Sequence, residues 1–112
     1  MTIFEKIATG QIPAEIVHST PDFIAFHDAH PQAPIHVLIV PRRPITRIGE
    51  AQPADAHLLG EMLLAAQIIA TKLGVANSGF RLVINNGQDA GESVPHLHIH
   101  LLAGRPLQWP PG

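Results

Sequence analysis

The stretch His96-Leu97-His98-Ile99-His100-Leu101-Leu102 alternates histidine with large aliphatic residues. Side chains alternate between the two faces of a β-strand, so this pattern predicts a strand with histidines on one face and aliphatic residues on the other. The aliphatic face is expected to pack on a helix, which leaves the histidine face directed away from that core. An ordinary polar sheet face is the alternative, but strict alternation over three histidines favours a functional site.

The helix best suited to cover the aliphatic face runs from about Ala54 to Leu73. Its apolar residues recur at helical spacing as Leu58, Met62, Ala65, Ile69 and Leu73, and the stripe is widened by Leu59, Leu63, Ala66 and Ala70. Gly74 follows at the position where glycine commonly ends a helix.

Apolar and β-branched runs predict four further strands, at Glu15–His18, Phe23–His27, Ile35–Val40 and Phe80–Asn85. The run Ile35–Val40 is nearly continuous, which is typical of a central strand buried on both faces. A short helix is expected over Ile3–Ala8. The prediction is a single α+β domain over residues 1–112, with a mostly antiparallel five-stranded sheet, one long helix packed on it and a C-terminal tail at 103–112.

Composition excludes several classes of protein. Of the 112 residues 46% are hydrophobic and 14% are charged, which argues against disorder, and a net charge of -2 argues against a broad nucleic-acid surface. No secretory signal is visible, and the apolar runs are far shorter than the roughly 18–20 residues of a membrane span. The absence of cysteine excludes disulfides and thiolate chemistry. We therefore expect a cytoplasmic protein with no nucleic-acid or membrane partner.

Two kinds of chemistry fit the three histidines. Imidazoles at positions i and i+2 can bind zinc, with His100 or His36 as a further ligand, but no carboxylate lies within or just after the strand. A neutral imidazole is also a nucleophile near neutral pH, and a neighbouring imidazole can protonate a leaving group. Adjacent histidines disfavour one another's protonation, which would keep the central one nucleophilic.

The loop before the histidines suits a phosphate group. Gly87 and Gly91 allow main-chain N–H groups to approach an anion closely, and Ser93 adds a hydroxyl donor. Asp89 and Glu92 would repel a highly charged polyphosphate, so a singly charged phosphodiester or phosphoramidate is the better fit.

The stretch His96–Leu102 matches the signature His-φ-His-φ-His-φ-φ, where φ is hydrophobic, and so resembles the histidine triad (HIT) superfamily. The resemblance to its histidine triad nucleotide-binding (Hint) branch covers nearly the whole chain, in Thr2–Ile7, Phe26–Asp28, Pro31–His36, Val40–Pro41, Gly91–Val94 and Trp109–Gly112.

This resemblance implies a homodimer in which the two sheets join into one. It also implies hydrolysis of purine nucleoside phosphoramidates through a covalent nucleotidyl-histidine that releases AMP or GMP, with no cofactor and no catalytic metal. His98 would be the nucleophile, and His100 would contact the phosphate or leaving group together with Ser93. His96 would pair with His36 as structural and electrostatic support.

The resemblance further implies a nucleotide-binding set. It comprises apolar walls (Ile3, Phe4, Ile7, Ile12, Phe26), a ribose region (His27, Asp28), a phosphate region (Asn85, Gly91, Glu92, Ser93, His98, His100) and Trp109, which would reach toward the partner's site. Each apolar residue taken alone is equally an ordinary core residue. The family often has glutamine at the position of Glu92, and a carboxylate cannot donate a hydrogen bond as an amide does. Pro95 replaces an aromatic residue of some relatives.

Three alternative functions stay open at this point. One is a dinucleoside polyphosphate hydrolase of a related histidine triad branch. Another is a nucleotide-binding scaffold whose activity is incidental to protein contacts, and the third is a metal-binding module.

Overall fold

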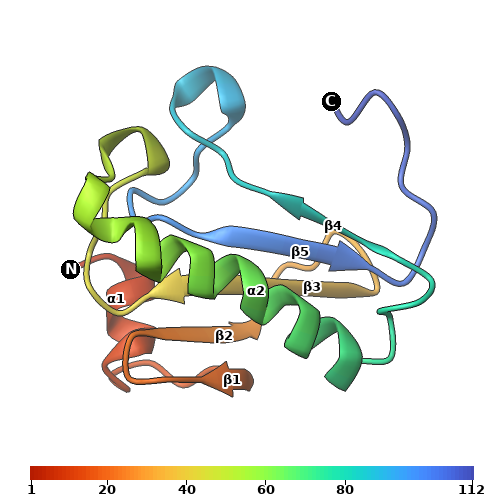
Figure 1. Ribbon diagram of the computed structural model, residues 1–112, viewed down its shortest axis with the longest axis horizontal. Coiled ribbons are helices and arrows are strands. Elements are labelled where there is room, and N and C mark those ends of the chain that lie inside the picture. Colours follow the sequence, from red (N-terminus) through yellow and green to blue (C-terminus); the bar gives the residue numbers. More distant parts are fainter.

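A computed structural model describes residues 1–112 (Figure 1). Its elements, in chain order, are α1 (Ile3–Ala8), β1 (Ile16–Ser19), β2 (Phe23–His27), β3 (Ile35–Pro41), α2 (Ala56–Lys72), β4 (Phe80–Val83) and β5 (Ile99–Ala103), with 3-10 turns at Ile48–Glu50, Pro53–Asp55 and Gln88–Ala90. The five strands form one open sheet in the order β1-β2-β3-β5-β4, and every neighbouring pair is antiparallel. The predicted α+β class is confirmed. None of the helices combines the length and apolar character that crossing a bilayer requires.

The sheet separates two hydrophobic clusters, and β3 contributes to both. Val37 and Ile39 pack in the cluster beneath α2, whereas Leu38 and Val40 pack in the cluster beneath α1. Successive side chains of a strand point to opposite faces, so a continuous apolar run suits a strand that is covered on both sides. In Figure 1 the long helix α2 crosses one face of the sheet, as the sequence predicts.

The helix α2 begins after a 3-10 turn that ends at the buried Asp55, whose carboxylate accepts a hydrogen bond from the backbone N–H of Gln52 (2.8 Å) and pairs with Arg43. Most of the predicted stripe is buried, but Leu63 is 45% exposed. Assigning Leu63 to the core was therefore wrong, because the buried arc of the helix is narrower than the apolar pattern suggests. Gly74 follows with a φ of 75°, a conformation that glycine adopts at low cost.

The short helix α1 is stabilised by a capping box. The backbone N–H of Glu5 donates to the hydroxyl of Thr2 (3.2 Å), and the backbone N–H of Thr2 donates to the Glu5 carboxylate (3.2 Å). Each bond satisfies a backbone donor that the first turn leaves unpaired. The buried side chains Phe4 and Ala8 then cover the face of the sheet opposite α2.

The predicted strand His96–Leu102 begins later than expected, at Ile99. Continuing the β3–β5 register beyond the pair Ile39 and Ile99 would put Leu97 opposite Pro41, which has no N–H to donate to the ladder. The backbone N–H of Leu97 instead donates to the carbonyl oxygen of Ile45 (2.7 Å). His96 and His98 therefore lie in the segment that leads into β5.

Other strand ends also shift. β4 stops at Val83 rather than Asn85, and the predicted tail starts one residue too early, because Ala103 belongs to β5 and pairs with Ile35 and Phe80. The tail proper follows β5 and carries the chain away from the sheet (Figure 1).

Candidate active site

Four histidines gather on the face of the sheet that α1 covers. The rings of His98 and His100 lie 4.9 Å apart, and those of His36 and His100 lie 5.2 Å apart, on the adjacent strands β3 and β5. His98 and His96 are only 4% and 1% exposed, and the ring of Phe4 packs edge-on against His98 at 4.8 Å. The histidines thus lie on the face directed away from the α2 core, as predicted, and α1 covers them there.

His98 is held in one tautomer. Its Nδ1 atom lies 2.7 Å from the carbonyl oxygen of His96, and a carbonyl oxygen can only accept a hydrogen bond. The proton of the neutral ring is therefore on Nδ1. The lone pair is then on Nε2, the atom that a nucleophilic imidazole uses in this orientation.

His96 has a structural position and does not pair with His36. Its Nε2–H donates to the carbonyl oxygen of Pro41 (2.8 Å), and its Nδ1 lies 3.4 Å from the hydroxyl of Thr2, the N-cap of α1. The predicted pairing of His96 with His36 is wrong, because Pro41 and Thr2 engage both of its nitrogens. His96 thus ties α1 to the end of β3.

His36 pairs instead with His100, and the contact defines both tautomers. The backbone N–H of Gln32 donates to Nδ1 of His36 (3.0 Å), so the His36 proton is on Nε2. That atom lies 2.9 Å from Nδ1 of His100 and donates to it. The proton of His100 is then on Nε2, which is buried and has no hydrogen-bond partner in the protein. A buried N–H without a partner is costly, so it is a donor available to a ligand.

Burial keeps these imidazoles neutral. It is the largest cause that lowers the pKa of His98, and it lowers the pKa of His36 against the opposing effect of Asp28. Burial, together with the neighbouring His98 and His36, lowers the pKa of His100 to about 4. At neutral pH the site therefore offers one imidazole lone pair and one N–H donor side by side.

Asp28, His36 and His100 also bring one potential metal-ligand atom each within 4.8 Å of one another. A histidine that binds a metal through Nε2 usually donates its other ring N–H to an acceptor. Nδ1 of His36 faces an N–H donor instead, so its Nε2 carries the proton and has no lone pair for an ion. The hydrogen-bond pattern at His36 thus favours proton donation over metal binding.

A cavity of about 630 Å³ lies beside the histidines. Its lining includes eight residues of the predicted set, from α1, the following loop, β2 and the loop before β5: Ile3, Phe4, Ile7, Ile12, Phe26, His27, Asp28 and Ser93. Leu38 and Val94 add to the apolar wall, and His30, for which no role was predicted, also lines the cavity. His98 is adjacent to the cavity, because Phe4 lines the cavity and also packs on the His98 ring.

A larger hollow of about 760 Å³ lies between α2 and the β1–β2 hairpin. None of the four clustered histidines lines it.

Other members of the predicted set lie outside this cavity. Trp109 is 81% exposed in the tail, and Asn85 is half-buried between β4 and the glycine loop. Gly87 and Gly91 have φ of 86° and 79°, which explains why the loop uses glycine there. His98 and His100 lie next to the lining rather than in it.

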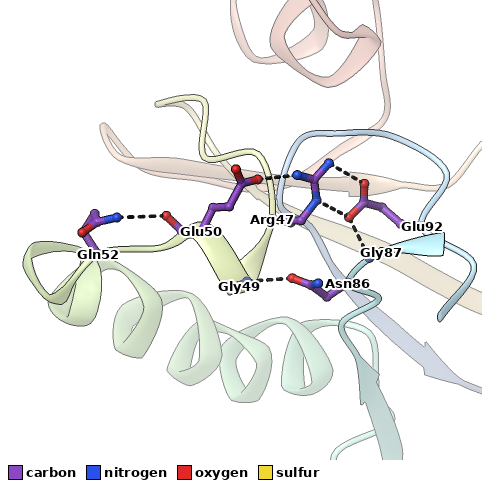
Figure 2. Close-up of polar contacts among 7 residues, drawn as sticks. All are labelled: Arg47, Gly49, Glu50, Gln52, Asn86, Gly87 and Glu92. Atoms are coloured by element: carbon purple, nitrogen blue, oxygen red, sulfur yellow. Dashed lines mark hydrogen bonds and ion pairs between the residues drawn. The ribbon is translucent and has the colours of Figure 1, made fainter. Parts of the chain in front are cut away.

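Glu92 does not extend freely toward a ligand. Its carboxylate accepts hydrogen bonds from Arg47 through both oxygens, at 2.9 and 3.0 Å, and from the backbone N–H of Gly87 at 3.0 Å (Figure 2). These contacts lower its pKa, so it carries a full charge that Arg47 neutralises. The expected repulsion between Glu92 and a phosphate is correspondingly reduced.

Sequence reasoning missed Arg47, Gln32 and Thr2. Arg47 is separated from Glu92 by 45 residues, and the contribution of Gln32 comes from its backbone, so no local pattern indicates either one. Thr2 did have a signal, because Thr2-Ile3-Phe4-Glu5 is a capping-box sequence.

The chain is similar in sequence to known proteins. Residues 9–107 match the family model of the HIT domain. The chain is 50% identical over 111 residues, 99% of its length and 96% of the relative's, to an uncharacterized HIT-like protein of Synechocystis, and 49% identical, with the same coverage, to one of Synechococcus elongatus.

Solved structures agree with that match. A HIT family hydrolase from Legionella pneumophila superposes with a TM-score of 0.97 at 42% identity, with all of both chains covered. A histidine triad nucleotide-binding protein from Candida albicans gives 0.84 at 27% identity, over 98% of this chain and 83% of the other. The chain belongs to the HIT family, whose solved members include hydrolases.

Proposed function

We propose that the protein hydrolyses purine nucleoside phosphoramidates, with His98 as the nucleophile. The observation that carries the proposal is the 2.7 Å contact between Nδ1 of His98 and the carbonyl oxygen of His96, which leaves Nε2 unprotonated. The lowered pKa of His98 supports it, since the ring is neutral at physiological pH. The similarity to a HIT family hydrolase supports hydrolysis as the class of reaction.

The reaction has two steps. Nε2 of His98 forms a bond to the α-phosphorus as the P–N bond breaks, and the departing amine takes up a proton from solvent. Water then attacks the same phosphorus, the bond to Nε2 breaks, and a nucleoside monophosphate is released. Nε2–H of His100, which has no protein partner, is the donor proposed to contact the phosphoryl oxygens or the departing nitrogen.

The cavity is proposed to hold the nucleoside. A volume of about 630 Å³ falls within the roughly 300–1,000 Å³ of small-molecule sites, and apolar side chains dominate its lining, which suits a flat base. Oδ1 of Asp28 accepts a hydrogen bond from the backbone N–H of His30 (2.8 Å), which orients the carboxylate. Such an oriented acceptor pair suits the two ribose hydroxyls.

A substrate panel combined with trapping of the covalent intermediate tests the proposal. Adenosine and guanosine 5′-phosphoramidates and diadenosine triphosphate would be compared for turnover, and intact mass spectrometry after acid-free quenching would detect a nucleotidyl adduct. We expect turnover of the phosphoramidates with an adduct that is absent from His98→Asn. Preferential cleavage of the polyphosphate would contradict the substrate class, and loss of activity in chelator together with stoichiometric zinc would contradict the mechanism.

A homodimer joined along β4 is part of the proposal. β4 is an edge strand of the sheet, and Phe80, Ile84 and the α2 residue Leu63 are 36%, 37% and 45% exposed. An unpaired strand edge with apolar neighbours favours pairing with a second copy, and the exposed Trp109 is then free to approach the partner's cavity. Sedimentation velocity would test this: the wild type should be dimeric and Ile84→Lys shifted toward monomer, whereas a monomeric wild type at tens of micromolar would exclude it.

A further inference from the structure

We propose that Arg47 and Glu92 form a clamp that positions the phosphate loop, residues 86–93, and that Arg47 is its positioning residue. The inference rests on the proposed function, because it assumes that this loop receives a phosphate. It concerns residues that lie outside the histidine cluster and outside the lining of the cavity.

The clamp joins two segments that are distant in the chain. Arg47 donates two hydrogen bonds to the Glu92 carboxylate, from Nε at 2.9 Å and from one terminal nitrogen at 3.0 Å (Figure 2). Its other terminal nitrogen pairs with Glu50. A second link runs parallel to it, from the backbone N–H of Gly49 to the amide oxygen of Asn86 at 2.7 Å. The loop is thus fastened at both ends, through Asn86 and Glu92, to the turn that contains Gly49.

The same carboxylate closes the loop on itself. Oε1 of Glu92 accepts from the backbone N–H of Gly87 at 3.0 Å, and the backbone N–H of Glu92 donates to the carbonyl oxygen of Gly87 at 3.1 Å. The residues Gln88–Gly91 are exposed, so the loop has little side-chain packing of its own to hold this conformation. The bidentate contact with a planar guanidinium supplies the constraint, and lysine could not reproduce its geometry.

The clamp acts on the site through Ser93. Ser93 follows Glu92 directly and lines the cavity, so the position of its hydroxyl depends on where Glu92 is held. The clamp also governs charge. Glu92 is close enough for its charge to influence His98, and its side chain is only 11% exposed. Without Arg47, the charge of this carboxylate would not be neutralised and would repel an incoming phosphate.

Three variants separate positioning from simple stability: Arg47→Gln, the double variant Arg47→Gln/Glu92→Gln, and Arg43→Gln as a control. The first leaves the carboxylate without its cation, the second replaces the ion pair by two amides that can still bond to each other and to Gly87, and the control breaks the pair with Asp55, which lies away from the loop. The readouts are kcat and KM for adenosine phosphoramidate, the Kd of AMP, and amide hydrogen exchange at Gly87.

We expect Arg47→Gln to lower kcat/KM and to weaken AMP binding, each about tenfold, with at least about tenfold faster exchange at Gly87. The double variant should recover kcat/KM and AMP affinity to within about threefold of the wild type, and Arg43→Gln should match the wild type in both. The clamp is refuted if Arg47→Gln leaves Gly87 exchange and AMP affinity within about twofold of the wild type, or if the double variant is no better than the single one.

A failure of the proposed function gives a different pattern. If the wild type binds AMP but hydrolyses no phosphoramidate, the proposed reaction is wrong. The role of the clamp can then still be tested by AMP affinity and by amide exchange at Gly87. A wild type that does not bind AMP at all would overturn both the nucleotide site and the role of the clamp in phosphate binding.

Discussion

Nδ1 of His98 lies 2.7 Å from the carbonyl oxygen of His96, two residues earlier in the chain, and both residues are buried. The contact depends on the segment before β5 leaving the sheet ladder, because a backbone carbonyl engaged in strand pairing would be less available to a side chain. Pro41 causes that departure, because it has no backbone N–H to donate to the segment that would pair with it. A proline on one strand thus helps to set the tautomer of a histidine on the next segment.

Replacing His98 by asparagine should abolish turnover and preserve binding. Asparagine can still donate to the carbonyl of His96, but it has no nucleophilic nitrogen, so kcat should fall by at least about a thousandfold. AMP affinity measured by calorimetry should stay within about threefold, since the cavity wall is unchanged. His18→Asn, on a strand that lies away from the cluster, is the matched control and should retain full activity. Near-normal hydrolysis by a folded His98→Asn protein would refute the nucleophile.

Replacing His36 should act through its neighbour His100. In His36→Leu the donor to Nδ1 of His100 is lost, so His100 can move its proton to Nδ1 and kcat should fall about 10- to 100-fold. His36→Gln keeps an N–H donor and should recover part of the loss. Long-range nitrogen–proton NMR of labelled histidine reports the tautomer directly. Retention of the Nε2–H form of His100 in His36→Leu would show that His36 does not control it.

The fold was largely predictable because its determinants are periodic. Apolar and β-branched runs indicated four strands, and alternation indicated the fifth. The apolar stripe indicated α2, and the two-sided strand Ile35–Val40 is β3 with both faces buried. Pattern alone could not show that Pro41 stops the ladder before His98, because that requires the register between β3 and β5. Nor could it show that Leu63 lies outside the buried arc of α2.

The candidate site was also only partly predictable from the sequence. The histidines and the apolar walls carry signals in the sequence, either as alternation or as resemblance to a family. The partners of those residues are non-local: Gln32 acts through its backbone, and Arg47 reaches across 45 residues to Glu92. Which histidine pairs with His36 is decided by a 2.9 Å contact between strands, and the resemblance pointed to His96 instead of His100. Partners of this kind become visible only when the chain is folded.

Thr2 should link the stability of α1 to the affinity of the cavity for AMP. Thr2→Ala removes the N-cap hydroxyl, which contributes about 1 kcal/mol, and also removes the contact with Nδ1 of His96. Because α1 carries Ile3, Phe4 and Ile7 into the cavity wall, AMP binding should weaken together with the free energy of unfolding in urea.

Two companion variants sharpen the Thr2 prediction. Thr2→Ser keeps the hydroxyl and should stay close to the wild type in both measurements. Thr9→Ala, at the exposed C-terminal end of the same helix, should cost no more than about 0.5 kcal/mol and leave AMP affinity unchanged. Equal losses in Thr2→Ala and Thr9→Ala would mean that the N-cap has no special role.

The protein should become less stable as the pH falls from 7 to 5. The pKa values of His18, His36, His98 and His100 lie below the ordinary 6.5 in the folded state, and that of His100 is about 4. Between about pH 6.5 and 4 the unfolded chain therefore binds more protons than the folded chain, and the free energy of unfolding must rise with pH in that window. The carboxylates Asp55 and Glu92 also have lowered pKa values, but they affect stability only below their ordinary values of 3.8 and 4.5, so the interval from pH 7 to 5 isolates the histidines.

Urea unfolding followed by circular dichroism gives the free energy of unfolding at each pH. Circular dichroism is preferred to fluorescence because Trp109 is too exposed to report on the core. His100→Gln removes one of the four groups and should flatten the pH dependence, whereas a free energy of unfolding that stays constant or increases from pH 7 to 5 would show that these imidazoles are not held neutral by the fold.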